Sequence, residues 1–168
     1  RTFAPTANLL TSRTNHDATR LPDGRVLVTG GNSNAFPEVF DPATGLFLAT
    51  AGAATTDRTY GGVSAVLPSG RLLVTGGQGA NFHFAGTGFV AGAISSAGEL
   101  FDASQTDFSL STATMASARR FHTATNLDDG RVLVVGGEGF PTGSGAGTTP
   151  TSVATVEAYD EATDTFTT

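Results

Sequence analysis

The stretch LPDGRVLVTGG, at residues 21–31, returns twice along the chain with few changes. Residues 67–77 read LPSGRLLVTGG, and residues 127–137 read LDDGRVLVVGG. In each copy a glycine ends a short polar turn, where it can supply the positive φ that closes a hairpin. The apolar run that follows is continuous rather than alternating, which is typical of a strand buried on both faces. The chain therefore repeats one hairpin three times. Each copy ends in a glycine pair where the chain leaves the sheet, and we interpret these pairs as scaffold: Gly30 and Gly31, Gly76 and Gly77, and Gly136 and Gly137.

A second motif follows each glycine pair. It reads EVFDPATGLF at 38–47, ELFDASQTDF at 99–108 and EAYDEATDTF at 157–166, and each copy ends on phenylalanine. Phe3 is a further counterpart of that closing residue. The sequence thus predicts one repeat segment spanning residues 1–168. Its repeats cover about 10–50, 56–111 and 115–168, and residues 1–9 form the last strand of a preceding unit.

Each repeat is predicted to hold four short strands. In the third repeat, HTATNL alternates before the turn, RVLVV follows it, EAYD makes a third strand and TFTT a fourth. Glycines interrupt every window long enough for a helix. Four antiparallel strands in a repeat of about 40 to 50 residues are typical of a β-propeller blade, which stacks between two neighbours. A β-sandwich is the structural alternative, but it gives no reason for a repeat of this length.

The repeated pattern resembles the kelch repeat, in the bacterial form that is similar to the propeller domain of galactose oxidase. The resemblance covers essentially the whole chain and implies an all-β fold of kelch-like β-propeller blades. Three four-stranded antiparallel repeats would then make a partial ring or half-propeller. The second repeat departs from the pattern, with Gly62 in place of a histidine and Thr59 in place of an arginine. The third repeat matches most fully, at Arg119, His122, Gly136, Gly137, Tyr159, Asp160 and Phe166.

Three blades do not close a ring, because a propeller needs at least about four and kelch relatives usually have about six or seven. Three alternatives follow: the chain is a piece of a longer polypeptide, two copies pair into a six-bladed ring, or the open edges are protected in another way. The chain begins and ends in a fourth-strand motif, which favours a fragment. If the piece is stable alone, a homodimer is the physical way to cover both open faces.

Composition limits the partners. The chain of 168 residues has no cysteine and a formal net charge of −6, and all nine basic residues are arginine. This negative charge opposes a phosphate-tracking surface, so no nucleic-acid partner is expected. No apolar run reaches the roughly 20 residues of a membrane span, and the first residues lack a signal-peptide pattern. The many Gly, Thr, Ser and Ala residues are common in secreted bacterial β-proteins, so an extracellular or cell-surface location is expected.

The histidines and tyrosines do not predict an active site. His16 and His122 occupy equivalent positions in separate repeats, which favours a structural role. His83 has no histidine, cysteine or carboxylate close to it in the sequence. The copper site of galactose oxidase uses a tyrosine crosslinked to cysteine, which this chain cannot form; its two tyrosines are Tyr60 and Tyr159. We therefore expect no catalytic residue, metal or cofactor in this chain.

The connections between strands point to one end of the blades. Strand alternation brings the 2–3 connections and the links between repeats to one end, which we call the loop end, and the short 1–2 and 3–4 turns to the other, the turn end. The turns are nearly identical, whereas the 2–3 connections vary: 32–37 is short, and 78–98 and 138–155 are long. Such variation usually marks a binding face. The candidate contacts are Arg58, Tyr60, Phe82, His83, Phe84, Phe89, Arg119, Arg120 and Phe140.

The sequence therefore predicts a non-catalytic interaction module that binds protein or carbohydrate through its loop end. Arginine and aromatic side chains are favoured anchors at interfaces, and aromatic rings also stack on sugars. Two alternatives stay open. The chain is a fragment of a galactose-oxidase-like or other carbohydrate-active enzyme, or it is a structural half-ring that self-assembles.

Overall fold

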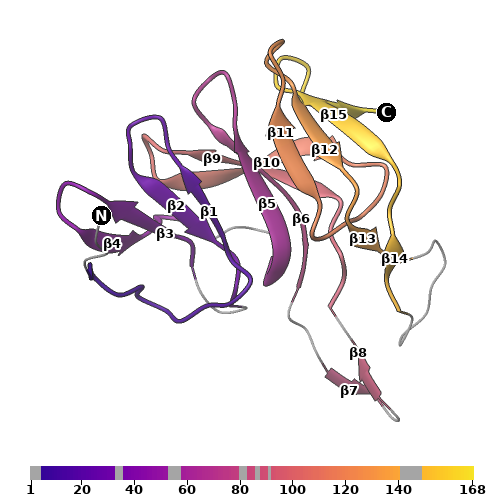
Figure 1. Ribbon diagram of the computed structural model, residues 1–168, viewed down its shortest axis with the longest axis horizontal. Helices are drawn as coiled ribbons and strands as arrows, with labels where there is room; N and C mark the ends of the chain where they lie inside the picture. Colours follow the sequence, from indigo (N-terminus) through magenta and orange to yellow (C-terminus); the bar gives the residue numbers. More distant parts are fainter. Residues whose placement is uncertain are drawn as a thin grey trace.

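The computed structural model describes residues 5–32, 36–52, 58–79, 83–85, 88–90, 92–140 and 149–168. Every regular element in these ranges is a β-strand, as Figure 1 shows. The predicted all-β class is therefore confirmed. A helix long and apolar enough to cross a membrane is not found in the described part of the chain.

Twelve of the described strands form three four-stranded antiparallel sheets, which we call blades 1, 2 and 3. Blade 1 consists of β1 (Asp17–Arg20), β2 (Val26–Thr29), β3 (Glu38–Asp41) and β4 (Leu46–Ala49). Blade 2 consists of β5 (Tyr60–Val66), β6 (Leu72–Gln78), β9 (Ala97–Asp102) and β10 (Asp107–Thr114). Blade 3 consists of β11 (Thr123–Asn126), β12 (Val132–Val135), β15 (Val156–Asp160) and β16 (Thr165–Thr167). In every blade the four strands pair in chain order, as the repeat predicted.

The two long 2–3 connections contain small hairpins of their own. In blade 2, β7 (His83–Ala85) pairs with β8 (Gly88–Val90), and in blade 3, β13 (Glu138–Gly139) pairs with β14 (Thr151–Ser152). Figure 1 shows the β7–β8 hairpin extending away from the blades, on the side opposite the 1–2 turns. Part of the long connection at residues 78–98 is therefore regular, because its backbone pairs with itself beyond the sheet.

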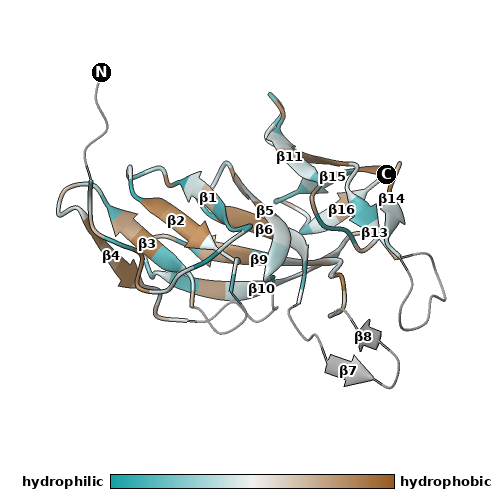
Figure 2. Ribbon diagram, turned by 60° about the horizontal axis from the view of Figure 1, so that its bottom comes forward, coloured by the Kyte–Doolittle hydropathy of each residue, from teal (hydrophilic) through white to brown (hydrophobic). Residues whose placement is uncertain are grey.

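The blades stack face to face through the apolar strands at their centres. Leu27, Val39 and Leu21 of blade 1 pack against Leu72 and Phe101 of blade 2. Between blades 2 and 3 the core consists of Ala65, Leu67, Leu73, Leu100, Ala113, Met115, Val132, Val134 and Tyr159. Successive residues of a strand point to opposite faces, so Leu72 and Leu73 enter different cores. This explains the continuous apolar runs, and Figure 2 shows the hydrophobic colour along β2.

A pair of aromatic rings links the third and fourth strands of each blade. The ring centroids lie 4.9 to 5.1 Å apart and the planes are tilted, the geometry that aromatic pairs prefer. The closing phenylalanine of the second motif therefore has one partner in every repeat. The pairs are Phe40 with Phe47, Phe101 with Phe108, and Tyr159 with Phe166.

The described residues before β1 contact the 3–4 turn of blade 1. The Thr6 hydroxyl and the Ala7 amide both donate to the Gly45 carbonyl, at 3.1 and 3.4 Å. Counted from the closing phenylalanine, Thr6 and Ala7 correspond to Ser111 and Thr112, which make the same kind of contact with blade 3. That residues 1–9 form the last strand of a preceding blade stays a prediction, because residues 5–9 form no strand and residues 1–4 lie outside the described range.

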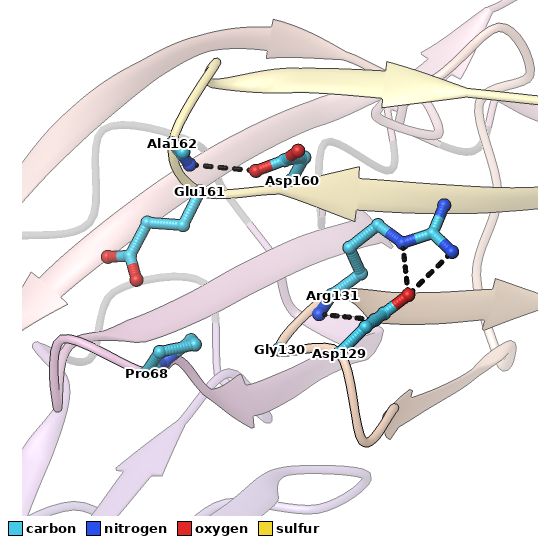
Figure 3. A pocket seen from close by; sticks show the side chains of 7 residues that line it. All are labelled: Pro68, Asp129, Gly130, Arg131, Asp160, Glu161 and Ala162. Atoms are coloured by element: carbon cyan, nitrogen blue, oxygen red, sulfur yellow. Dashed lines mark hydrogen bonds and ion pairs between the residues drawn. The ribbon is translucent and has the colours of Figure 1, made fainter.

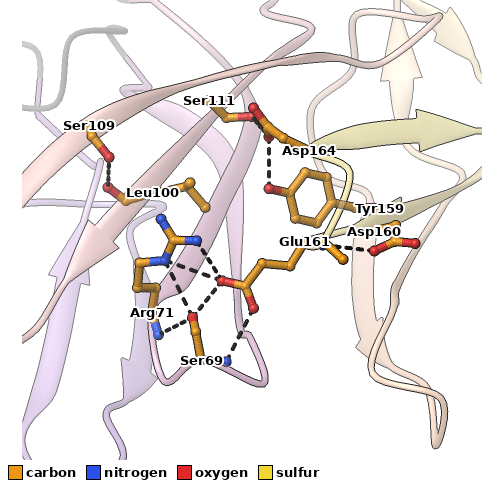
Figure 4. Close-up of polar contacts among 10 residues, drawn as sticks. Ser69, Arg71, Leu100, Ser109, Ser111, Tyr159, Asp160, Glu161 and Asp164 are labelled. Carbon is orange, nitrogen blue, oxygen red and sulfur yellow. Dashed lines mark hydrogen bonds and ion pairs between the residues drawn. The ribbon is translucent and has the colours of Figure 1, made fainter.

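A carboxylate at the 3–4 turn of blade 3 binds the outer strand of blade 2. Asp164 accepts hydrogen bonds from the Ser111 and Tyr159 hydroxyls (Figure 4). It also accepts from the hydroxyl and the amide of Thr112. Burial alone would raise the pKa of Asp164, but these bonds to its charged form lower that pKa to about 2. Beside it, Glu161 accepts from Ser69 and Arg71 of blade 2. The turn end is therefore closed by polar contacts between blades.

His122 makes the corresponding contact near the loop end. Its Nε2 lies 2.9 Å from the Thr75 hydroxyl of blade 2, and the ring is buried. Burial, and then the charges of Arg119 and Arg58, lower the pKa of His122 from 6.5 to about 4. His16, its counterpart in blade 1, is exposed. The structural role expected for this histidine position is thus realised by a side-chain partner on the neighbouring blade.

We predict that the His122 contact weakens on acidification. The pKa of His122 is lower in the folded chain than in the unfolded chain, so the unfolded chain binds more protons between pH 6.5 and 4. The contribution of His122 to the free energy of unfolding is therefore complete only above this pH range and is lost as the pH falls through it. The free energy of unfolding should fall by about 3 kcal/mol by pH 4 through this one group. Urea unfolding of the parent chain and of His122→Gln, at intervals between pH 4 and 8, measures it as the difference between the two curves. His16→Gln is the exposed control, and an identical pH dependence in the parent and His122→Gln would contradict the prediction.

Candidate binding face

One arginine of each blade is buried and paired with a glutamate near the start of the third strand. The closest atoms are 2.6 Å apart in blade 1, 3.1 Å in blade 2 and 2.5 Å in blade 3, and all six side chains are almost completely buried. A buried ion pair is stable only when its remaining hydrogen-bonding groups are also satisfied. We call these pairs the Arg–Glu anchors: Arg13 with Glu38, Arg58 with Glu99, and Arg119 with Glu157.

Each anchor arginine also binds the backbone at both ends of the 2–3 connection. In blade 3, Arg119 donates to the Gly136 carbonyl at 3.2 Å and to the Thr155 carbonyl at 2.9 Å. The corresponding acceptors are Gly30 and Phe36 for Arg13, and Gly76 and Ala97 for Arg58. The first acceptor belongs to the glycine pair, whose members all have φ between 60° and 92°. One guanidinium therefore fixes where each connection leaves the sheet and where it returns.

The glutamate of each anchor holds the incoming chain as well. Glu38 accepts from the Leu10 and Thr11 amides at 2.8 and 3.1 Å, and Glu157 accepts from the Ala116 amide at 2.7 Å. These amides belong to the segment that leads into the blade at the loop end. The two kinds of connection at that end therefore meet at a single buried pair.

The second blade keeps its anchor despite the change at Thr59. Counted from the glycine pair, Thr59 stands where blades 1 and 3 have arginine, as the sequence showed. The neighbouring Arg58 nevertheless makes all three types of anchor contact. Its guanidinium reaches the same groups from one residue earlier, so the apparent departure does not extend to the contacts.

Arg58 and Arg119 are therefore not surface contacts, in contrast to their expected place at the binding face. Both are buried, and their guanidinium groups are committed to a carboxylate and to backbone carbonyls. Burial lowers the pKa of Arg58, and the Glu99 charge opposes this shift. They support the loops from beneath instead of meeting a ligand.

Arg120 is the predicted arginine that reaches the surface of the loop end. Its side chain donates to the Gln78 amide oxygen and lies 3.3 Å from a Glu138 carboxylate oxygen. The backbones of Arg120 and Glu138 exchange two hydrogen bonds of 2.9 Å. Gln78 is buried and donates to the Gly92 carbonyl at 2.8 Å, so Arg120 lies where the two long connections meet.

Phe121 is the loop-end residue that the sequence analysis missed. The Arg120 guanidinium carbon lies 5.0 Å from the centroid of its ring, and the Phe121 amide donates to the Gly61 carbonyl at 2.9 Å. Its ring remains close to half exposed. The available signal was the pair of residues RF before His122, where the first repeat has TN and the second YG.

The other candidates are distributed along the same end. Tyr60 begins β5 and pairs with Gln78 in the strand ladder, and Phe140 directly follows β13. In the β7–β8 hairpin, His83 lies opposite Val90 and Phe84 opposite Phe89. Phe84 and Phe89 are therefore partners in the backbone register of this hairpin. Phe82 lies outside the described residues.

Two equivalent hollows lie at the turn end. One, of about 430 Å³, is lined by the 1–2 and 3–4 turns of blade 3 and by Pro68 of blade 2 (Figure 3). A counterpart of about 450 Å³ lies between blades 1 and 2. In the first hollow, Asp129 pairs with Arg131 and Asp160 accepts from the Ala162 amide. These polar groups cap their own turns. The hollow occurs twice because the turns that line it are repeated in each blade.

The described residues contain no group of three or more His, Cys, Asp or Glu side chains that could hold a metal ion. The acidic side chains discussed above are bound to arginines or to backbone amides instead. The loop end therefore presents fixed loops that bear aromatic, guanidinium and carboxylate groups.

Comparison with known proteins supports the fold. No protein-family model and no curated protein matches the chain. Among solved structures, the chain is similar to that of YjhT, a kelch-type protein, with a TM-score of 0.72 and 14% sequence identity. The match covers 94% of this chain and 50% of that chain, so this chain spans half the length of that protein. At this identity the likeness shows the fold alone.

We predict that breaking one Arg–Glu anchor destabilises the fold strongly. Arg119→Met leaves Glu157 buried without its cationic partner and should lower the free energy of unfolding by about 3–5 kcal/mol. The double variant Arg119→Met with Glu157→Leu should recover part of this loss, because it removes the uncompensated charge. Urea unfolding of the parent chain, the single variant and the double variant measures the three free energies of unfolding.

Arg131→Met is the matched control, since its pair with Asp129 is about half exposed and such surface ion pairs contribute little to stability. If Arg119→Met cost no more than Arg131→Met, the anchor would not have the role assigned to it.

Proposed function

We propose that this chain is a non-catalytic interaction module that binds a protein or carbohydrate ligand through its loop end. The observation that supports this most directly is the contrast between the two ends of the blades. The turn-end loops repeat nearly unchanged, while the loop-end connections of blades 2 and 3 extend into the hairpins β7–β8 and β13–β14 (Figure 1). Variable loops on a repeated scaffold are where binding surfaces usually form.

The way the loops are held also supports a binding role. Each anchor arginine fixes the two ends of a 2–3 connection, so a long loop begins and ends on rigid backbone. Fixing loops before binding lowers the entropic cost of ordering them when a ligand arrives. A long connection supported in this way can vary in sequence without disturbing the blade.

The cellular setting and the enzyme alternative belong to this proposal. We propose that the module acts outside the cell or at its surface, because its many Gly, Thr, Ser and Ala residues are common in secreted bacterial β-proteins. The enzyme alternative is that the chain is part of a longer, galactose-oxidase-like or other carbohydrate-active polypeptide, in which the loop end presents a substrate to a catalytic part elsewhere. Turnover by the 168-residue chain itself would contradict the non-catalytic proposal.

A second candidate function is self-assembly, favoured by the open face of blade 3. Val135 and Val156 pair across β12 and β15, and both are exposed. The blade 2 counterpart of Val135 is Thr75, which is buried beneath blade 3. We propose that in the isolated chain a second copy covers this face with its own blade 1.

Light scattering tests the assembly, with an expected mass of twice 17.0 kDa. Val135→Glu should shift the chain toward monomer, because it places a charge in the apolar contact. A stable monomer of the parent chain at high concentration would contradict self-assembly and leave the binding proposal untouched.

We predict that shortening the β7–β8 hairpin strongly weakens ligand binding without unfolding the blade. The Gly79 amide donates to the Ala93 carbonyl at 3.1 Å, so the two ends of the hairpin are already paired. Replacing residues 81–91 with Asn-Gly should therefore close the connection, since this pair favours a tight hairpin turn. Ligands are first identified with the parent chain on an immobilised glycan panel and by affinity capture, and a captured protein is purified and tested directly. Affinity should fall at least tenfold.

The matched control changes the other end of the same blade. Residues 103–106, at the 3–4 turn, are replaced by their blade 1 counterparts 42–45, which have a similar turn. This variant should bind like the parent chain. Unchanged affinity after hairpin shortening, or loss only in the control, would remove the loop end from the proposal.

A further inference from the structure

Phe121 occupies a backbone position that the repeat reserves for residues tolerant of a positive φ. The residue two positions after the first-blade anchor is Asn15, with φ of 56°, and its second-blade counterpart is Gly61, with φ of 67°. Phe121 has φ of 55° at the same position in blade 3. Asn and Gly adopt this left-handed conformation readily, whereas a bulky side chain is strained there. The scaffold therefore explains the conformation but not the phenylalanine.

The ring of Phe121 is held in a fixed orientation without being buried. A Cβ added to Gly61 would lie 2.5 Å from Phe121 Cδ1, so the ring rests directly on the Gly61 backbone. The Arg120 guanidinium carbon lies 5.0 Å from the ring centroid. Even so, 48% of Phe121 stays exposed. A strained residue that gains so little burial is better explained by a surface role than by packing.

The polar groups beside this ring balance one another in charge. Arg120 pairs with Glu138 at 3.3 Å and binds the neutral amide of Gln78. The Arg120 Nε is buried and has no hydrogen-bond partner among the described residues. The surface thus combines an apolar ring with a guanidinium donor and a carboxylate acceptor, at zero net charge. The overall charge of −6 further disfavours an anionic ligand.

We propose that Phe121, Arg120 and Glu138 form a subsite for the ring of a neutral hexose or pentose within a larger glycan. The apolar C–H face of the sugar packs on the exposed part of the Phe121 ring. Its hydroxyls accept from Arg120 and donate to Glu138, which uses both partners without leaving a buried charge unpaired. This subsite rests on the proposed loop-end function and names its ligand class.

Phe121→Asn tests the subsite, because it installs the residue that blade 1 has at the same position. The probes are neutral gluco-, galacto-, manno- and xylo-oligosaccharides, with oligogalacturonates as the acidic comparison, and binding is measured by titration calorimetry. We expect at least one neutral series to bind the parent chain and the acidic series not to bind. Phe121→Asn should weaken binding at least tenfold, while the melting temperature is unchanged or rises by about 2–4 °C through relief of strain.

Phe36→Asn is the matched control, since Phe36 is 53% exposed in the 2–3 connection of blade 1 and its contact to Arg13 uses only its backbone carbonyl. It should leave glycan affinity unchanged. The subsite is overturned if no neutral oligosaccharide binds, if the acidic series binds more tightly, or if Phe121→Asn melts well below the parent and so proves to be a packing residue. A protein ligand that depends on the β7–β8 hairpin, found without glycan binding, would overturn the subsite and leave the loop-end proposal standing.

Discussion

The buried Arg–Glu anchor is the interaction on which the arrangement of each blade depends. A guanidinium with five donors in a planar fork can bind a carboxylate and several carbonyls at once, which a lysine cannot do. In each blade it joins the start of the third strand, the glycine pair and the end of the 2–3 connection. The glutamate then receives the incoming chain in blades 1 and 3. Removing either charge would leave the other buried, so the pair is retained or lost as a unit.

This shared frame makes the differences between blades informative. The aromatic pairs, the glycine conformations and the anchors are the same in all three blades, so a residue that departs from them needs another explanation. The second blade shows one kind of departure, in which Arg58 restores the anchor from a shifted position. Phe121 shows the other kind, because the scaffold accepts it only at the cost of strain.

The sequence predicted the blades well because their signals are local. Turn residues and closing aromatics lie within a few residues of the contacts they make, and each glycine pair follows its turn at a fixed spacing, so strands and pairing order followed directly. The anchors could not be predicted in the same way, since arginine and glutamate are separated by 25, 41 and 38 residues in the three blades. The recurring Glu at the start of the second motif was visible, but its partner depended on how the intervening loop folds. The same limit applied to Arg58 and Arg119, whose exposure was expected from chain position and whose burial is a tertiary effect.

The strain at Phe121 persists because its neighbours are fixed on both sides. Before it, Arg120 exchanges two backbone hydrogen bonds with Glu138; after it, His122 is buried against Thr75 of the neighbouring blade. The Phe121 amide itself is bound to the Gly61 carbonyl. These contacts fix the backbone at this position whatever its side chain is. The interface between blades 2 and 3 therefore offsets the conformational strain of Phe121. The interface that holds the blades together therefore also orients the Phe121 ring at the loop end. A change that loosens this interface, such as protonation of His122, should also leave the Phe121 ring less fixed in orientation.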